Sequence, residues 1–415
     1  MIKKRFGAML LIAAFALSAL CGCAGSGASS SGQNTTAEVV TPAQTEGAEP
    51  VTDDETERET YENTENINKD MESMKASDIV SQMNLGISIG NSLDSTNSGI
   101  IRVDQPWKWE TAWGNPKITE ELVDALVDAG FTTIRIPVSW TDHLAPGPDY
   151  LIVESWMDRV QEVVDYAYDR GVYVILNLHH EDWNYPYYDN QEKACEIMEA
   201  VWRQIAERFK DYDEHLIFEG QNEPRKVGTS LEWSGGDKEG WDVVNATNKA
   251  FIETIRSSGG SNPYRMLMIP DYAANSAIAM EHLEVPEDDD RIIVSIHAYT
   301  PYNFALNANG SAEWNNDSDS QDIDTLMSSI KRLFTDKGIP VIIGEFGAVN
   351  KDNAGARAEW LKYYMSAAKE IGVPCFWWDN GSFNSNGENL GFIDRRTYEI
   401  KYPELLEAMK EVYPG

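Results

Sequence analysis

The chain has little positive charge. Its 415 residues include 34 Lys and Arg against 68 Asp and Glu, which gives a formal net charge of −34. Binding to nucleic acid requires a basic surface that neutralises phosphates, and docking on anionic lipid requires clusters of Lys and Arg. We therefore expect no nucleic-acid partner and no polybasic contact with a membrane.

Cysteine is also scarce, with 4 residues in the chain, which is too few for a disulfide scaffold. Cys21 and Cys23 lie at the end of an N-terminal leader. We expect Cys195, in a helical pattern, and Cys375, in an apolar strand, to be buried free thiols. A single disulfide is the alternative.

The N-terminal apolar run, residues 9–20, is shorter than the ~20 residues of a permanent membrane span. It follows basic residues 3–5, as in a secretory leader. The sequence Leu-Cys-Gly-Cys at 20–23 resembles a bacterial lipobox. We therefore predict a lipoprotein-type signal peptide over 1–22 and lipidation of Cys23, which would make the protein an extracellular lipoprotein on a bacterial surface. Plain secretion is the alternative.

Residues 23–68 contain few apolar side chains and many Ser, Thr and Glu. From Glu46 to Glu65 the acidic side chains face one basic residue, Arg58. Such a segment cannot bury enough apolar surface to offset its ordering entropy. It is predicted to be a disordered acidic tether.

From residue 69 to 415 the pattern alternates short apolar runs with amphipathic helical ones. The predicted strands cover residues 85–89, 131–137, 172–178, 216–219, 265–269, 291–296, 341–344 and 373–377. The predicted helices cover 120–129, 156–169, 191–209, 243–257, 273–282, 323–335, 356–370 and 404–412. Runs of Val and Ile without alternation are typical of parallel strands buried on both faces.

Eight such units predict a single (β/α)8 TIM barrel of the α/β class. A doubly wound open sheet is the alternative, and it usually carries a Gly-rich phosphate turn after its first strand. Here the stretch from Gly86 to Gly90 lacks the G-x-G-x-x-G spacing, and no G-x-x-x-x-G-K-[ST] sequence occurs in the chain.

Polar and ionisable side chains gather where the predicted strands end, which is where barrels of this type hold their active sites. Three of the 6 histidines belong to this group. Its members are Arg135, His179, His180, Asn222, Glu223, His297, Tyr299, Glu345 and Trp378.

Glu223 and Glu345 form the most informative pair. They lie 122 residues apart and follow the fourth and seventh strands. In a closed barrel these strands face each other, so the two carboxylates meet across the mouth. A protonated and an ionised carboxyl group across a cleft are what glycoside hydrolysis requires. Ion pairing of either glutamate with Arg135 is the alternative reading.

The sequence resembles glycoside hydrolase family 5, the cellulase family, and within it the broad-specificity subfamily 4. The similar segments run in family order from about residue 77 to the end of the chain. They are GNSLDS (90–95), ETAWGNP (110–116), GFTTIRIPVSW (130–140), VILNLHHEDW (174–183), LIFEGQNEP (216–224), VSIHAYTPY (294–302), VIIGEFGA (341–348) and CFWWDNG (375–381).

The resemblance implies a role for each matching position. Glu223 in Asn-Glu-Pro would be the general acid/base, and Glu345 in Gly-Glu-Phe-Gly the nucleophile. Asn222 would hold the sugar 2-hydroxyl. Tyr299 and Arg135 would position Glu345 and keep it ionised. The remaining implied sugar-binding residues are His179, His180, His297 and Trp378, the last as a stacking floor.

Two alternatives concern the helper residues. His179 and His180 could be metal ligands, but neighbours on a strand point to opposite faces and chelate one ion poorly. By the same alternation only one of Trp377 and Trp378 can face the cleft. Other tryptophans that fall in loop-like regions suit a glucan cleft, and we favour Trp183 among them; these are Trp113, Trp183, Trp233, Trp241 and Trp314.

The first strand departs from the family pattern. It reads Gly-Ile-Ser-Ile-Gly-Asn at 86–91, where the family commonly has Gly-Trp-Asn-Leu-Gly-Asn. Packing of this strand and contacts near Asn91 are therefore expected to differ.

The sequence thus predicts a monomeric, retaining endo-β-1,4-glucanase that acts on β-glucan polysaccharides without a metal or other cofactor. Two alternatives stay open. The same fold and mechanism could act on xylan or mannan, or the protein could be a non-catalytic glycan-binding lipoprotein.

Overall fold

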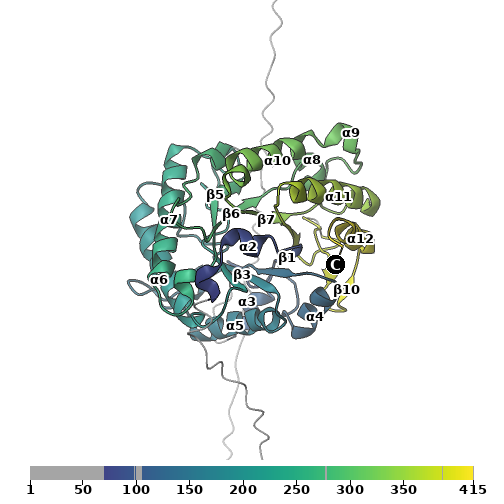
Figure 1. Cartoon of the computed structure of the whole chain (residues 1–415). Helices are drawn as coiled ribbons and strands as arrows, with labels where there is room; N and C mark the ends of the chain where they lie inside the picture. Colours follow the sequence, from purple (N-terminus) through teal and green to yellow (C-terminus); the bar gives the residue numbers. More distant parts are fainter. Residues whose placement is uncertain (1–69, 98, 100–104, 276–277, 386, 415) are drawn as a thin grey trace, which may run out of the picture. The chain divides into compact units, whose positions relative to one another are not determined.

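A computed structural model describes residues 70–97, 99, 105–275, 278–385 and 387–414. Eight parallel strands close into a barrel in the order of the sequence, so that the first strand pairs with the last (Figure 1). The strands are β1 (Leu85–Ile89), β2 (Thr133–Ile136), β3 (Tyr173–Asn177), β4 (Leu216–Glu219), β5 (Leu267–Asn275), β6 (Ile292–His297), β7 (Val341–Phe346) and β8 (Cys375–Asp379). The predicted TIM barrel is confirmed.

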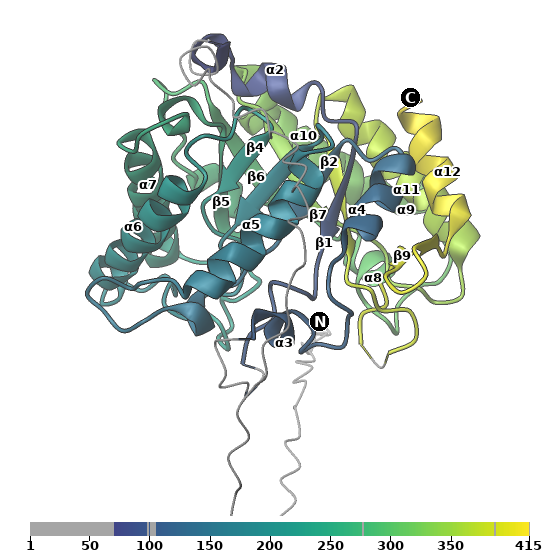
Figure 2. The same ribbon diagram turned by 90° about the horizontal axis from the view of Figure 1, so that it is seen from below.

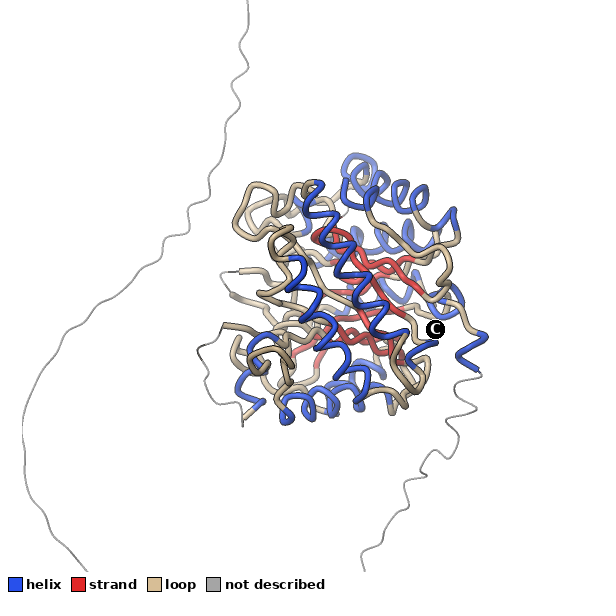
Figure 3. The backbone as a smooth tube through the Cα atoms, turned by 90° about the vertical axis from the view of Figure 1, so that its left-hand side faces the viewer, coloured by secondary structure: helices blue, strands red, loops and turns tan. Residues whose placement is uncertain are grey.

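The helices surround this barrel (Figure 3). The long ones are α4 (Glu120–Asp128), α5 (Glu154–Tyr168), α6 (Gln191–Arg208), α7 (Lys238–Arg256), α10 (Gln321–Leu333), α11 (Ala354–Glu370) and α12 (Pro403–Val412). The short elements are α2 (Ala76–Val80), α3 (Pro106–Glu110), α8 (Tyr302–Ala305), α9 (Asn316–Asp319), the hairpin β9 (Ile393–Asp394) and β10 (Glu399–Ile400), and the 3₁₀ turns η1 (Thr141–His143), η2 (Asn262–Tyr264), η3 (Ile278–His282) and η4 (Thr335–Lys337).

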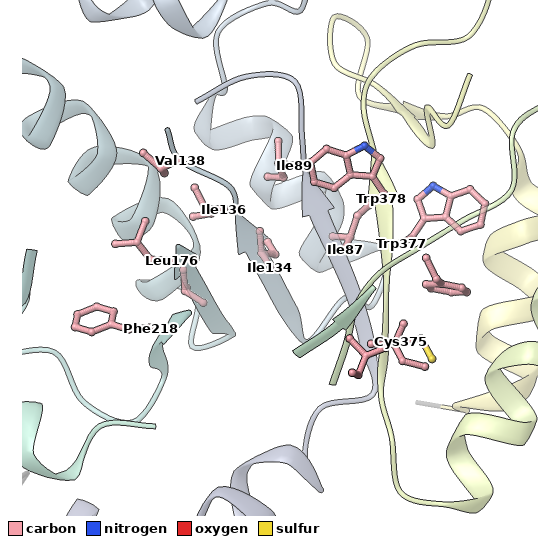
Figure 4. Packing of buried hydrophobic residues seen from close by; sticks show 14 of the residues in the cluster. Ile87, Ile89, Ile134, Ile136, Val138, Leu176, Phe218, Cys375, Trp377 and Trp378 are labelled. Atoms are coloured by element: carbon pink, nitrogen blue, oxygen red, sulfur yellow. The ribbon is translucent and has the colours of Figure 1, made fainter. Parts of the chain in front are cut away.

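Each strand has one face toward the helices and one toward the barrel interior, because side chains alternate along a strand. The outer faces form a large apolar cluster with the helices (Figure 4). Ile134 and Ile136 of β2 belong to this cluster, whereas Arg135 between them does not. The same period of two places the apolar Ile217 and the acidic Glu219 of β4 on the inner face.

The inner face changes character along the barrel. Toward the amino ends of the strands it is apolar, with Tyr173, Ile217 and Met268 in one buried cluster. Toward the carboxyl ends it holds buried polar groups, among them Arg135 and Glu219, each with no exposed surface. The barrel is thus filled by an apolar layer below a polar one.

Helix α2 closes the apolar end of the barrel. Ala76, Ile79 and Val80 pack into the inner cluster and are at most 3% exposed. The backbone N–H of Ala76 donates to Asp290, just before β6. Figures 1 and 2 show α2 over this end of the strands, with α3, α8 and β9 toward the opposite end.

Two sequence-based assignments change. A helix was predicted over 273–282, but residues up to Asn275 extend β5, and a 3₁₀ turn covers Ile278–His282. The extension follows an irregular register between Pro270 and Asn275. Helix α7 begins at Lys238, capped by the Asp237 side chain on the Gly240 N–H, five residues before the predicted start at 243.

The predicted signal peptide, the lipidation site Cys23 and the tether over 23–68 lie outside the described residues. Within the described part of the chain, no helix combines the length and the apolar character needed to cross a bilayer. Cys195 and Cys375 are free thiols as predicted, the first half-buried and the second buried.

Candidate active site

The polar groups meet at the carboxyl ends of the strands. Glu345 is part of β7, and Glu223 follows the end of β4 by four residues. His297 ends β6 and lies between them. One side-chain oxygen or nitrogen of each of these three residues lies within 4.8 Å of the others. The structure therefore brings together the two carboxyl groups that the sequence paired.

Arg135 connects three side chains of this site. Its guanidinium is fully buried and donates through Nε to Glu219 (2.7 Å), through Nη1 to Glu345 (2.8 Å) and through Nη2 to Asn222 (2.7 Å). Such a three-way fork fixes the positions of all three acceptors. Because the Asn222 Oδ1 accepts from Arg135, Nδ2 is the donor that this amide can offer to another group.

Glu345 receives a second hydrogen bond, from the Tyr299 hydroxyl at 3.0 Å. Each of its oxygens therefore has a donor, Arg135 on Oε1 and Tyr299 on Oε2. Both predicted contacts of Glu345 are present. A carboxylate held on both oxygens has a fixed direction of attack.

Glu223 has different partners. Its Oε1 lies 2.8 Å from the His297 Nδ1, and its Oε2 lies 3.5 Å from the Arg225 Nη1. Burial would raise the pKa of Glu223, but the hydrogen bond to His297 and that residue's positive charge lower it below its usual value. For Glu345, burial and the Glu223 charge raise the pKa, although His297 and Arg135 offset part of the shift.

His297 connects the pair. Burial alone would lower its pKa, but the charges of Glu345 and Glu223 raise it above the usual value. The His297 Nδ1 lies 2.8 Å from a Glu223 oxygen and 3.7 Å from a Glu345 oxygen, so its charge acts on both carboxyl groups. The Nε2 of His297 is buried and has no hydrogen-bond partner within the described residues. A Cβ on Gly344 would lie 3.3 Å from this Nε2, so glycine leaves space for the ring.

His179, His180 and Trp378 form an adjoining group. The His179 ring stacks on Trp378 with centroids 5.5 Å apart and 2° between the planes. Trp378 is 7% exposed, whereas Trp377 is fully buried and packs against Phe346 outside the barrel. The predicted division between the two tryptophans is confirmed.

The expectation that His179 and His180 point to opposite faces is wrong. Their ring centroids lie 4.4 Å apart, because both residues follow the end of β3 at Asn177, where strand alternation no longer applies. With Asp94 they form a group whose ligand atoms lie within 4.8 Å of one another. Burial lowers the pKa of both rings.

Two groups near the cleft therefore have the ligand types of a metal site, Asp94 with His179 and His180, and His297 with Glu223 and Glu345. In the first, Asp94 already accepts backbone N–H groups from Asn91 and Ser92, so its oxygens are partly engaged. The second is at the same time the carboxyl pair needed for glycoside hydrolysis.

The loop tryptophans differ in exposure. Trp183 is 9% exposed and its indole N–H donates to the Glu181 carboxylate at 2.8 Å. Trp113 and Trp233 are 40% and 54% exposed. Trp113 and Trp233 therefore offer more accessible aromatic surface than Trp183. A sugar-binding role for Trp183 stays a prediction.

Sequence reasoning did not assign several residues of this site. Glu219 accepts from Arg135, from the Ser295 hydroxyl (2.7 Å) and from the Asn177 amide (3.0 Å). Strand parity was the available signal, because Glu219 is two residues beyond Ile217 on the inward face. Glu388, in the loop after β8, is a further unassigned carboxylate: burial, then the charges of Glu345 and Glu223, raise its pKa.

The arrangement has counterparts in known proteins. The sequence profile described as "Cellulase (glycosyl hydrolase family 5)" matches residues 93–384. Endoglucanase B of Neocallimastix patriciarum is 49% identical over 344 residues, which are 82% of this chain and 72% of that protein.

Two solved structures are also similar. A GH5-4 broad-specificity endoglucanase from Ruminococcus champanellensis with bound cellotriose has a TM-score of 0.78 and 44% identity, over 81% of this chain and 98% of that one. A GH5 xyloglucan-specific endo-β-1,4-glucanase from a metagenomic library, in complex with cellotriose, has a TM-score of 0.78 and 43% identity, over 81% and 98%. The shared barrel, the carboxyl pair and the extent of these matches show that the chain belongs to glycosyl hydrolase family 5 and is a glycoside hydrolase.

Proposed function

We propose that the protein is a retaining endo-β-1,4-glucanase that hydrolyses β-glucans. The observation that carries the mechanism is the short separation of the Glu223 and Glu345 carboxyl groups, within 4.8 Å between oxygens. Retaining enzymes hold this pair about 5 Å apart, whereas inverting enzymes need roughly 6.5–9.5 Å to admit a water molecule between them.

In the first step an oxygen of Glu345 attacks the anomeric carbon, and the bond from that carbon to the glycosidic oxygen breaks. Glu223 gives its proton to the leaving oxygen, so the reducing-end part of the polymer departs as an alcohol. In the second step Glu223 takes a proton from water, and the water oxygen displaces Glu345. The proton and the configuration at carbon are both restored.

The two glutamates divide these roles through their partners. Glu345 has donors on both oxygens, one of them the permanently charged Arg135, and this arrangement supports the nucleophile. Glu223 shares a 2.8 Å hydrogen bond with His297. The hydrogen bond to His297 lowers the pKa of Glu223 against the effect of burial, and the charges of Glu345 and Glu223 raise the pKa of His297. A proton in this hydrogen bond is shared by the two groups, and Glu223 acts as the acid when it carries that proton.

The substrate class follows from the relatives and the exposed aromatics. Cellotriose is bound in both similar structures, and one of those enzymes is named for broad specificity and the other for xyloglucan. We therefore favour cellulose, mixed-linkage glucan and xyloglucan over xylan or mannan. The intact carboxyl pair argues against the alternative of a non-catalytic glycan-binding protein.

We further propose export by the leader over 1–22, lipidation at Cys23 and a tether over 23–68 that joins the anchor to a monomeric catalytic domain over 69–415. The N-terminal sequence pattern supports this proposal. Metabolic labelling of the expressed protein with a radioactive fatty acid, with Cys23→Ser as the control, tests the lipid anchor. Equal labelling of both proteins would refute it.

Reducing-sugar release by the purified protein tests the activity. It is measured in parallel on carboxymethyl-cellulose, mixed-linkage β-glucan, xyloglucan, xylan and mannan, with Glu345→Gln as the matched control. We expect release from the glucans and a loss of at least about 10³-fold in the variant, because it lacks the nucleophile. Release only from xylan or mannan would change the substrate, and equal activity of the variant would refute the mechanism.

A further inference from the structure

The loop between β4 and α7 places an exposed aromatic ring beside the acid/base glutamate. Trp233 is 54% exposed, which is unusual for the largest apolar side chain. The guanidinium carbon of Arg225 lies 4.3 Å from the centroid of its ring, a cation–π distance. Arg225 is two residues after Glu223.

Arg225 is held in place by three further contacts. Its Nη1 donates to the backbone oxygen of Glu223 at 3.0 Å and approaches the Glu223 Oε2 at 3.5 Å. Its Nε donates to the Glu232 Oε1 at 3.3 Å. Glu232 is the residue before Trp233. A single side chain therefore links the carboxyl group of Glu223 to the exposed indole.

Further hydrogen bonds connect the rest of the loop. The other oxygen of Glu232 accepts the Gly228 N–H at 2.8 Å. The Tyr272 hydroxyl accepts the Lys226 N–H and donates to the Leu231 carbonyl, at 2.8 and 3.1 Å. Exposure of Trp233 is thus a property of an ordered surface, and an ordered exposed ring next to a cleft suits stacking against a ligand.

We propose that Trp233 is a platform for the sugar on the leaving-group side of the cleaved bond, and that Arg225 is a positioning residue that ties this platform to Glu223. The inference rests on the proposed function. Glu223 gives its proton to the glycosidic oxygen, so the sugar beyond that oxygen must lie on the Glu223 side of the cleft. Trp233 is the exposed ring joined to Glu223 through one intervening side chain.

Two substrates with different leaving groups test the platform. Cleavage of cellotetraose releases its reducing-end fragment, a sugar, whereas cleavage of β-cellobiosyl fluoride releases only a fluoride ion, which cannot stack on an indole. The readout is the ratio of kcat/KM for the tetraose to that for the fluoride. We expect Trp233→Ala to lower this ratio about tenfold and Trp233→Tyr to restore most of it, since tyrosine keeps an aromatic face.

Trp107→Ala is the matched control, because Trp107 is 47% exposed but lies on α3, whereas the side-chain partners of Glu223 among the described residues are His297 and Arg225. Its ratio is expected to stay at the wild-type value. An unchanged ratio in Trp233→Ala would overturn the platform. Absence of wild-type activity on both substrates would instead overturn the proposed function, so the two failures are distinguishable.

A double-mutant cycle tests the role of Arg225. Arg225→Met is expected to lower the ratio in the wild-type protein and to lower it no further in Trp233→Ala, because Arg225 acts through Trp233. Arg225→Lys keeps the charge without the planar guanidinium, so its ratio should lie between those of the wild-type protein and Arg225→Met. Additive effects of the two substitutions would show that Arg225 does not position the platform and would overturn that part of the proposal.

Discussion

At the scale of single residues, the site depends on a buried charge network. Arg135 has no exposed surface and binds the carboxylates of Glu219 and Glu345. Removing one member of such a network leaves another charge buried without its partner. The carboxylate proposed as the nucleophile, Glu345, is therefore coupled to Glu219, a residue that touches no substrate atom in the proposed mechanism.

Glu219→Gln tests this coupling. The carboxylate of Glu219 accepts from Arg135, Ser295 and Asn177, and a glutamine amide has only one acceptor oxygen for these donors. We expect a loss of about 3–5 kcal/mol in the free energy of unfolding and at least about a tenfold fall in kcat/KM. Urea unfolding and kinetics on mixed-linkage glucan measure the two effects.

The same variant has a predicted pH signature. Neutralising Glu219 removes a negative charge near Glu345. The Arg135 charge then acts on Glu345 without competition from Glu219 and favours the ionised form of Glu345, so the pKa of Glu345 should fall. The acidic limb of the kcat/KM profile should then move to lower pH. A shift to higher pH would contradict this picture of the network.

The sequence paired the two carboxyl groups proposed to react, but it did not reveal the residues that support them, for a physical reason. Glu223 follows β4 by four residues and Glu345 is the second-last residue of β7, and both stand in recognisable sequence contexts. Glu219 ends a strand, but its role appears only when Arg135, Asn177 and Ser295 from three other strands are seen to converge on it. Partners that come from different strands meet only in the closed barrel, so the sequence of one strand does not reveal them.

At the scale of elements, the turn η1 presents a buried histidine to helix α5. The His143 ring stacks on Trp156 with centroids 3.8 Å apart and meets the Trp109 ring edge to face at 5.0 Å. Burial lowers the pKa of His143 to about 3. This contact therefore requires the neutral imidazole.

The consequence is a loss of stability in acid. The folded pKa lies below the unfolded value of about 6.5, so the stability that His143 contributes is present above pH 6.5 and is lost as pH falls toward 3, by about 1.4 kcal/mol per pH unit. Urea unfolding at about pH 7 and pH 5 gives the loss in the free energy of unfolding between these two pH values. This loss should be roughly 2 kcal/mol smaller in His143→Phe, which keeps an aromatic ring, than in the wild-type protein. Equal falls would contradict the linkage.

The glycine directly after strand β1 contacts the site. A Cβ on Gly90 would lie 2.3 Å from the Trp378 ring, so Gly90→Ala must displace the indole that stacks on His179. We expect a fall of about tenfold or more in kcat/KM on glucan oligosaccharides. Gly355→Ala in α11 is the control, because a Cβ there meets nothing within 4 Å and should leave activity unchanged. Equal activity of both variants would contradict the tight fit.

The elements were predicted best where the pattern was strongest. The bounds of β1 and β4 coincide with the predicted ranges 85–89 and 216–219. The end of β5 was missed because Pro270 interrupts the apolar run and the Ala-rich sequence after it favours a helix. Ala273 and Ala274 instead adopt positive φ values of 62° and 46°, a local conformation that no residue pattern here announces.

At the scale of the whole molecule, α2 completes the barrel core. Its apolar side chains meet the amino ends of the strands and have almost no exposed surface. Removal of residues 1–83 would expose this layer, and we expect a loss of about 5 kcal/mol in the free energy of unfolding, from roughly 1.5–3 kcal/mol per large buried side chain. Removal of residues 1–68 is the control and should leave the urea midpoint unchanged, as a catalytic domain over 69–415 requires. Equal stability of the two truncated proteins would contradict this function of α2.

The position of α2 also determines at which end of the barrel a support or a fused protein would be attached. The chain enters the barrel at the end closed by α2, while Glu223 and Glu345 lie at the carboxyl ends of the strands. A resin bead or a fused protein joined directly at residue 70 is therefore held at the end opposite the proposed site of cleavage. A long polymer can then be threaded across the opposite end without passing the point of immobilisation.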